Sequence, residues 1–238
     1  MAGLTEDKAR ALRNFSACDV SDALLKLQDV PSGTTATAGF LADLAHYAPA
    51  GNAVDIVVAP ISTVQFIPKG ESLPPIAQEN PDLHGFPTAT HWVDLTQPGT
   101  VVLVDQPDGQ KCAVLGGIMA SRMSAIGAKG VIVNGRVRDL NELRNSGLSI
   151  WARGQSTVGA GAEAKPGARN IPIRVGGVTV FPNDIAFCDP VEGVVVIPNG
   201  LLDSVLELMP RLTEADDRVR GDIENGSTVF DAFKKHRL

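Results

Sequence analysis

The chain is poor in cysteine, aromatic residues and positive charge. Its three cysteines, Cys18, Cys112 and Cys188, lie far apart with no CxxC spacing, and aromatic residues make up 5% of the 238 positions. This spacing excludes a zinc site built on cysteine pairs, and the odd count favours reduced thiols in the cytoplasm. A net charge of −6 argues against a nucleic-acid or anionic-membrane partner, because both require a basic surface.

Long apolar runs and the common catalytic motifs are missing as well. No apolar stretch approaches the roughly 20 residues that cross a bilayer, which predicts a soluble protein without a membrane partner. The sequence contains no P-loop, no GxSxG nucleophile turn and no HExxH zinc motif. Its four histidines stand in no recognisable arrangement, so histidine-based nucleophilic or metal chemistry has little support.

What the chain does contain is enough apolar sequence for one large folded unit. It is 44% hydrophobic and 20% charged, which is ordinary for a globular protein, and we expect a single domain over residues 1–238. Segments with strand and helix patterns alternate, which predicts an α/β fold. Charged, amphipathic helices are expected at the C-terminal end, within residues 201–238.

Residue patterns give the following expected elements. Helices are predicted at residues 5–15, 16–28 and 88–95, a loop at 68–87, and turns between hairpin strands in 175–198. Residues 53–66 are typical of one long strand, or of two strands interrupted at Pro60. Residues 100–105 and 149–157 are also predicted to contain strands.

The stretch 116–143 is the most informative part of the sequence. Gly116 and Gly117 precede a predicted helix of about ten residues, a short buried strand follows at 131–133, and Asn134-Gly135 is expected to turn the chain. The free N–H groups at the start of a helix attract anions. Arg138 suits a carboxylate or a keto acid, and the adjacent carboxylate of Asp139 suits Mg²⁺. The pattern therefore predicts a small carboxylic acid held beside a metal ion.

This arrangement resembles the signature of the RraA-like family, which includes metal-dependent 4-hydroxy-4-methyl-2-oxoglutarate aldolases and the ribonuclease E regulator RraA. The family signature has Gly, an acidic residue, twenty further residues and then Arg-Asp, and here Gly116-Gly117 is followed twenty residues later by Arg138-Asp139. Three further segments resemble family blocks: SDAL at 21–24, GGVTVFPND at 176–184 and CDPVEGVVVIP at 188–198. The resemblance covers residues 15 to 233.

The resemblance implies a fold, an assembly and a role for each site residue. The fold would be the layered swivelling β/β/α fold, assembled as a homotrimer or homohexamer with sites at subunit boundaries. Arg138 would contact the keto acid and act in catalysis, and Asp139 would hold Mg²⁺ or Mn²⁺. The substrate carboxylate would bind the backbone of four consecutive residues, Gly116, Gly117, Ile118 and Met119.

One position departs from the family signature, because Gly117 stands where the family has an acidic residue. Loss of a positioned proton-transfer group typically costs about 10²–10⁴ in rate. In the family a carboxylate from the C-terminal helix of a neighbouring subunit joins the site, so Asp216 or Asp217 is the expected catalytic replacement. Glu163 is a second candidate. We expect the change to Gly117 to weaken aldol cleavage more than decarboxylation, because decarboxylation has no hydroxyl group to deprotonate.

By this resemblance the protein is expected to be a divalent-metal-dependent carbon-carbon lyase acting on short 2-oxo acids. It would cleave substrates such as 4-hydroxy-4-methyl-2-oxoglutarate, or decarboxylate oxaloacetate, through a pyruvate enolate. Two alternatives remain open. The first is a lyase or isomerase of a specialised pathway that uses the same anion and metal pocket. The second is a protein-binding regulator that has the fold but no catalytic activity.

Overall fold

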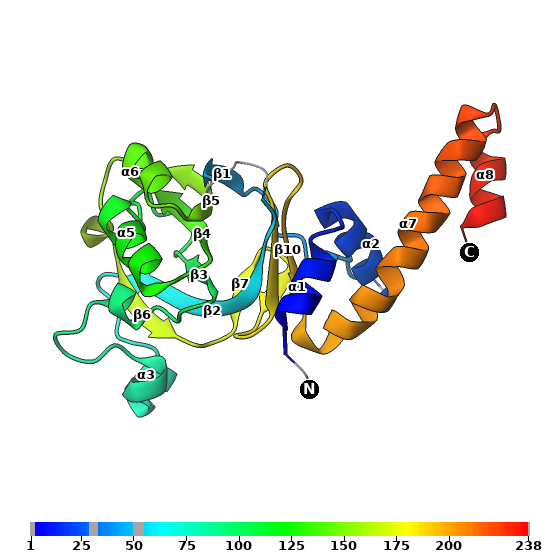
Figure 1. Ribbon diagram of the computed structural model, residues 1–238. Helices are drawn as coiled ribbons and strands as arrows, with labels where there is room; N and C mark the ends of the chain where they lie inside the picture. The colour runs from blue at the N-terminus through cyan, green and yellow to red at the C-terminus, as the bar shows by residue number, and fades with distance from the viewer. Residues whose placement is uncertain (1–2, 29–32, 50–54, 238) are drawn as a thin grey trace.

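A strongly bent mixed sheet forms the centre of the molecule (Figure 1). The computed structural model describes residues 3–28, 33–49 and 55–237. The strands lie in the order β1-β5-β4-β3-β2-β9-β10, and β6 pairs with β2 beside this path. Their bounds are β1 (Ala45–Ala48), β2 (Val57–Pro68), β3 (Val101–Asp105), β4 (Gly130–Val137), β5 (Ser149–Gln155), β6 (Ala164–Arg169), β9 (Ile185–Asp189) and β10 (Gly193–Ile197). This nearly closed sheet confirms the predicted α/β class.

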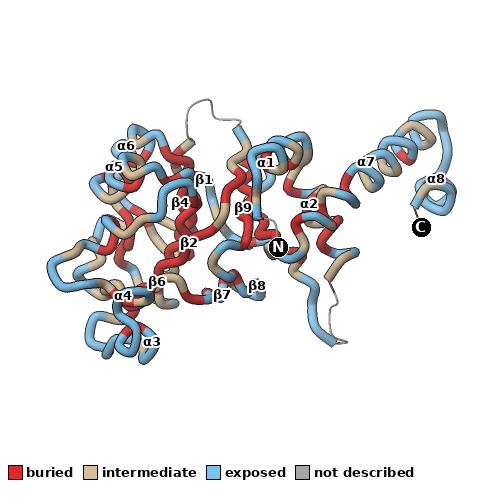
Figure 2. Tube along the Cα trace, turned by 60° about the horizontal axis from the view of Figure 1, so that its bottom comes forward, coloured by how far each residue is buried: buried red, intermediate tan, exposed pale blue. Residues whose placement is uncertain are grey.

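Strands β2, β3, β4 and β5 are parallel and are buried on both faces (Figure 2). One face packs against the helices α5 (Gly117–Ile126) and α6 (Leu140–Asn145), with Val104 and Val133 in that part of the core. On the opposite face, Leu103 and Ile132 share a core with β9, β10 and the hairpin of β7 (Ile173–Val175) and β8 (Val178–Val180). Burial on both faces explains the nearly continuous apolar runs of these strands.

Strand β2 runs through Pro60 without a break, so the alternative of two strands is wrong. Val57 to Pro60 pair with β9, whereas Ile61 to Gln65 pair with β3. Pro60 lies where β2 changes partner. The first N–H after it, that of Ile61, donates to the backbone oxygen of Asp184 at 2.7 Å. The missing N–H of proline therefore falls where the hydrogen-bond pattern changes in any case.

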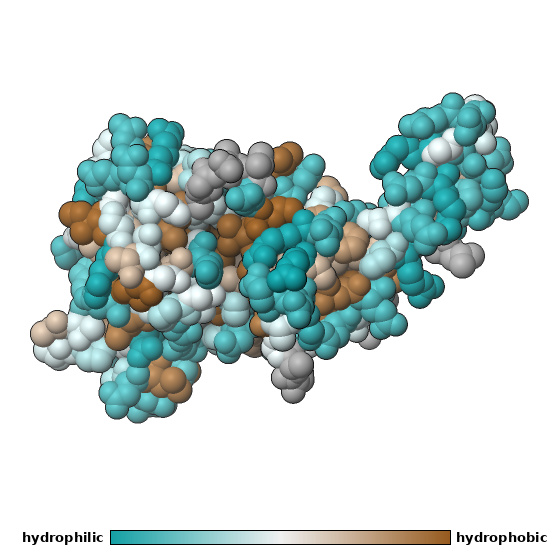
Figure 3. Space-filling model, viewed as in Figure 1, coloured by the Kyte–Doolittle hydropathy of each residue, from teal (hydrophilic) through white to brown (hydrophobic). Residues whose placement is uncertain are grey.

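The predicted N-terminal helices are present as α1 (Glu6–Leu12) and α2 (Ala17–Leu27). Thr5 caps α1, and Ser16 with Asp19 forms a reciprocal capping box at the start of α2. Both helices pack on the first part of α7 (Leu202–Glu224), in a core separate from those beside α5. The C-terminal part of α7 and α8 (Val229–His236) extend from the body as a largely hydrophilic arm (Figure 3).

Three segments differ from their predictions. The expected loop at 68–87 contains two short helices, α3 (Pro75–Glu79) and α4 (Pro81–His84), each with proline in its first turn, where no N–H is required. The expected helix at 88–95 is a shorter 3₁₀ helix, η1 (Trp92–Leu95). Asn134-Gly135 is not a turn, because β4 continues to Val137 through an irregularity in its pairing with β5. The irregular pairing accommodates Asn134 and Gly135 within the strand, although these residues favour a turn.

All three cysteines are free thiols, and Cys112 and Cys188 are buried. Burial in an apolar core raises the pKa of the Cys188 thiol. Among the described residues, no helix combines the length and apolar character that a membrane crossing requires.

Candidate active site

The returning strand of a strand-helix-strand unit brings the two halves of the Gly-Gly and Arg-Asp pattern together. Leu115 forms a parallel bridge with Val137, and the N–H of Arg138 donates to the backbone oxygen of Leu115 at 3.0 Å. Helix α5 fills the connection between these two neighbouring segments. Gly116 and Arg138 therefore lie side by side, although 22 positions separate them in the chain.

The N-terminus of α5 points its backbone donors at this junction. Gly116 is the residue before the first helical turn, and as glycine it has no side chain of its own to cap the helix. The N–H of Gly117 lies 3.3 Å from Oδ2 of Asp139, so a carboxylate already occupies one first-turn donor. A helix start that accepts this carboxylate can also bind the carboxylate of a small acid through the donors of Ile118 and Met119.

Asp139 is held in an unusual backbone conformation at the same place. Its φ of 60° and ψ of 48° are left-handed, although it is not glycine, and it precedes α6 directly. Such backbone geometry is disfavoured and collects at functional sites. Oδ2 of Asp139 lies 3.4 Å from Nε of Arg138, and both side chains remain substantially exposed, at 35% and 43%. This ion pair is open to solvent and to a ligand.

Glu142 is the functional candidate that the sequence reasoning missed. A Cβ atom added at Gly117 would lie 2.0 Å from Oε2 of Glu142, so this side chain fills the space that the acidic residue of the family signature would need. Glu142 comes from the first turn of α6, and no other described residue pairs with its carboxylate. An acid there also suits the helix dipole, which is the simplest structural reason for it. The sequence did contain an indication of this role. An acidic residue stands three positions after Asp139, in a chain that has glycine where the family signature has its acidic residue.

Gly116 and Gly117 are required by these close contacts. A Cβ at Gly116 would lie 2.7 Å from Oδ2 of Asp139, and one at Gly117 would overlap Glu142. Two carboxylates therefore converge on the glycine pair from the β4–α6 connection. No group of three or more His, Cys, Asp or Glu side chains gathers around one point in the described part of the chain. Two carboxylates still fit Mg²⁺, which usually binds one or two of them and keeps several waters.

The two aspartates expected to assist catalysis lie at the other end of the chain. Asp216 and Asp217 are on α7, on the opposite side of the body from α5 (Figure 1). Asp216 pairs with Arg237 at 2.6 Å and is 32% exposed, whereas Asp217 pairs with Arg220 at 3.2 Å and is 71% exposed. Within one chain the structure does not bring them to Arg138 and Asp139.

Glu163, the second candidate acid, already has a structural task. One of its oxygens accepts hydrogen bonds from the N–H groups of Lys111 and Cys112, at 2.7 and 2.6 Å. These bonds hold the segment that leads into Gly116, and they lower the pKa of the Glu163 carboxyl. The geometry therefore assigns Glu163 to loop positioning.

A second polar group occupies the carboxyl ends of the same parallel strands, and we call it the Asp105 row. It consists of Asp105 on β3, Asn134 on β4 and Arg153 on β5. Asn134 donates to Asp105 at 2.6 Å, and Arg153 donates to the amide oxygen of Asn134. Burial raises the pKa of Asp105 to about 6, against the opposing effect of the Asn134 hydrogen bond. Strand alternation places the row on the face of Leu103 and Ile132, away from α5.

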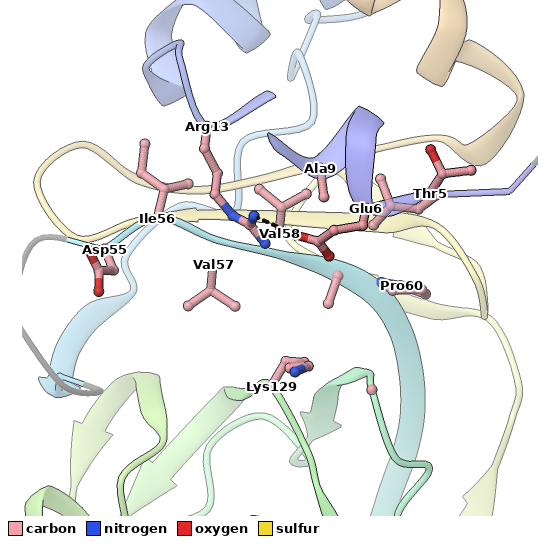
Figure 4. A pocket seen from close by; sticks show the side chains of 13 residues that line it. Thr5, Glu6, Ala9, Arg13, Asp55, Ile56, Val57, Val58, Pro60 and Lys129 are labelled. Atoms are coloured by element: carbon pink, nitrogen blue, oxygen red, sulfur yellow. Dashed lines mark hydrogen bonds and ion pairs between the residues drawn. The ribbon is translucent and has the colours of Figure 1, made fainter. Parts of the chain in front are cut away.

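A cavity of about 760 Å³ between α1 and the start of β2 offers less chemistry (Figure 4). Its most prominent charged groups, Glu6 and Arg13, neutralise each other in an ion pair of 3.1 Å. Lys129 lies on the opposite wall. The two acids among the described lining residues, Glu6 and Asp55, lie apart (Figure 4), so the junction of α5, β4 and α6 is the stronger candidate site.

Comparisons with known proteins identify the family of the chain. Residues 17–196 match the RraA-like family model, described as Aldolase/RraA. DlpA from Legionella pneumophila is 24% identical over 176 residues, which cover 74% of this chain and 27% of DlpA. A protein of Halalkalibacterium halodurans named "Putative 4-hydroxy-4-methyl-2-oxoglutarate aldolase" is 32% identical over 123 residues, covering 52% of this chain and 57% of that protein. The aligned part thus spans less than two thirds of either relative.

A solved structure confirms the predicted fold. RraAS2 of Streptomyces coelicolor, an unusual member of the RNase ES inhibitor RraA protein family, superposes with a TM-score of 0.67. The alignment covers 95% of this chain and 100% of that chain, at 22% sequence identity. At this identity the likeness establishes the fold and nothing about activity.

Proposed function

Because the chain belongs to the RraA-like family, we propose that it is a divalent-metal-dependent carbon-carbon lyase acting on short 2-oxo acids. The observation that carries the proposal is the convergence of Arg138 and two carboxylates on the N-terminus of α5. A keto acid needs an anion site, a cation at its keto oxygen and a proton acceptor, and these groups can supply all three. The name of the Halalkalibacterium relative supports the same reaction class.

In this mechanism the substrate carboxylate binds the free first-turn N–H groups of α5. Arg138 donates to the keto oxygen and stabilises the negative charge that develops there as the carbon-carbon bond breaks. Asp139 would hold Mg²⁺ or Mn²⁺, which when bound supplies Lewis-acid polarisation of the substrate. The left-handed backbone at Asp139 directs its carboxylate at the glycine turn.

Glu142 takes the place of the missing signature acid. Its carboxylate fills the volume beside Gly117, so it can accept the proton of the substrate hydroxyl, directly or through a water. Aldol cleavage requires this step, whereas loss of CO₂ from oxaloacetate does not. The expected weakness in aldol cleavage therefore depends on how well Glu142 replaces an acid at position 117.

The proposal includes a homotrimer or homohexamer in which a neighbouring subunit completes the site. The exposed apolar side chains of α8, among them Val229 at 54% and Phe230 at 74%, favour a partner that covers the C-terminal arm. Of the two expected aspartates, Asp217 is better placed to reach the site of another chain. Its side chain is more exposed than that of Asp216, and its ion pair with Arg220 is longer than the Asp216–Arg237 ion pair.

The deciding experiment measures pyruvate release from 4-hydroxy-4-methyl-2-oxoglutarate and from oxaloacetate, with Mg²⁺ and with EDTA. Wild type is compared with Arg138→Ala, which we expect to lose about 10²–10³ in rate. Arg122→Ala is the matched control, because Arg122 lies on the same helix α5 but forms an exposed ion pair with Asp94 of η1. If a folded, oligomeric wild type releases no pyruvate from either compound, the lyase proposal fails and the regulator alternative gains support.

A further inference from the structure

An apolar cavity of about 460 Å³ lies next to the candidate site and has no role in the mechanism above. We call it the aryl pocket. It lies between four parts of the chain: the segment 69–91 that contains α3 and α4, the strands β2 and β6, and the 3₁₀ turn η2 (Ala160–Ala162). Its lining includes Phe66, Leu73, Phe86, Trp92, Ala160 and Gly161.

The aryl pocket and the anion site share a wall. A Cβ added at Gly159 would lie 3.3 Å from Nη1 of Arg138, and the next two residues, Ala160 and Gly161, line the pocket. On the other side, Met119 of the α5 first turn packs in the same apolar cluster as Trp92. Gly159 therefore lies between the guanidinium of Arg138 and the segment that lines the cavity.

The chemistry of the walls favours an apolar occupant. Phe66 and Trp92 meet edge to face, with ring centroids 5.3 Å apart at 86°. Thr90 and His91 are the polar residues in the lining, and no lysine or arginine is among the described residues that line it. Nζ of Lys69 donates to the backbone oxygen of Gly161 at 2.6 Å, so this cation already has a partner, and a second carboxylate would gain less here than an apolar group. A cavity of about 150 Å³ is enough to bind benzene, and this one is larger.

We propose that the aryl pocket binds an aromatic or branched apolar group on C4 of a 4-hydroxy-2-oxo acid, while the acid end occupies the α5 anion site. This inference rests on the proposed function and names its substrate class. With 4-hydroxy-2-oxo-4-phenylbutanoate, the C3–C4 bond breaks and its electron pair forms the pyruvate enolate. The hydroxyl proton passes to Glu142, benzaldehyde leaves, and protonation of the enolate at C3 gives pyruvate.

The test compares kcat/KM for 4-hydroxy-2-oxo-4-phenylbutanoate and 4-hydroxy-4-methyl-2-oxoglutarate, with oxaloacetate as the reference for the basic chemistry. We expect the phenyl substrate to be preferred by at least about tenfold, because its ring leaves water. Gly161→Phe should remove that preference by occupying the pocket, since a Cβ there meets no atom within 4 Å. Gly70→Phe is the matched control, because Gly70 is equally open and does not line the pocket.

Each outcome separates the pocket from the proposed reaction. If oxaloacetate is decarboxylated but the phenyl substrate is not preferred, or if Gly161→Phe lowers both activities equally, the aryl pocket is wrong and the lyase remains. If no compound is turned over, the lyase proposal fails, and a measurement of ligand affinity then tests the aryl pocket. Trp92 fluorescence should then report affinity for 2-oxo-4-phenylbutanoate at least about tenfold above that for 2-oxobutanoate, and Gly161→Phe should abolish the difference. Equal affinities would overturn the proposal.

Discussion

Two polar clusters lie at the carboxyl ends of the same parallel strands and differ in how their hydrogen bonds are used. In the Asp105 row, the acid, the amide and the arginine bond to one another in sequence. At the glycine turn, Arg138 and Asp139 touch at 3.4 Å and stay exposed, and Glu142 has no partner in the described part of the chain. The hydrogen-bonding groups of the Asp105 row bond to one another, whereas the glycine turn retains donors and acceptors that a ligand could use.

The backbone conformation also differs between the two clusters: it is regular in the Asp105 row and unusual at the glycine turn. Asp105 and Asn134 are directly opposite each other in regular strand pairing. Asp139 stands in a left-handed conformation directly after β4, where the chain leaves the sheet. A perturbed pKa alone would have pointed to Asp105, at about 6, and away from the candidate site at the glycine turn. The candidate site is therefore assigned from unused bonding capacity and unusual backbone geometry, because burial also shifts the pKa of structural acids.

The largest expected effect comes from removing the charge of Asp139. Asp139→Asn should lower pyruvate release by about 10³, because the cation loses its protein carboxylate. Asparagine tolerates the left-handed backbone, so the melting temperature should stay within about 2 °C of wild type. Turnover and Mn²⁺ binding by paramagnetic resonance are measured together. Normal metal affinity in this variant would assign the ion to other residues.

Glu142→Gln should have the next largest effect and should separate the two reactions. We expect aldol cleavage to fall by about 10²-fold and oxaloacetate decarboxylation by less than about tenfold, because only cleavage needs a proton acceptor for the hydroxyl. The measurement is kcat/KM on both substrates over a range of pH. Glu207→Gln on α7 is a suitable control, since it removes an acid outside both clusters. Equal losses on both substrates would make Glu142 a structural residue.

Asp105→Asn should change stability and leave activity alone. The folded pKa of about 6 exceeds the ordinary value of 3.8, so between these values the folded state holds more protons than the unfolded state. Stability therefore falls as pH rises through this window, by up to about 3 kcal/mol. The variant should melt on the order of 5 °C higher at pH 7.5 and at the wild-type temperature near pH 4, in parallel thermal scans. A loss of activity without a change in melting would move the Asp105 row into the site.

The smallest expected effect concerns the second subunit. Asp217→Asn should lower turnover by up to about tenfold if its carboxylate reaches the glycine turn of a neighbour, and Asp216→Asn should lower it less. Mixing Asp217→Asn with Arg138→Ala chains tests this directly, because shared sites regain activity when one subunit supplies each intact group. Absence of any recovery in mixed oligomers would place the whole site within one chain.

Much of the fold follows from local sequence patterns. The capping residues Thr5 and Ser16 mark α1 and α2, the glycine pair marks α5, and the hairpins after Val175 follow their turn residues. The errors occurred where tertiary contacts outweighed local preference. Pro60 was tolerated because β2 changes partner there, and Asn134-Gly135 became part of β4 because neighbouring strands hold the extended chain.

The sequence alone determined the residues of the candidate site that the family signature includes, Arg138, Asp139 and the glycine pair. It also determined the α/β class, since strand and helix periodicities are local properties. Only the tertiary structure placed Glu142 in the space beside Gly117, assigned Glu163 to the loop before Gly116, and set the aryl pocket against Arg138. These relations depend on which distant segments pack together, and that is decided by the three-dimensional path of the chain between them.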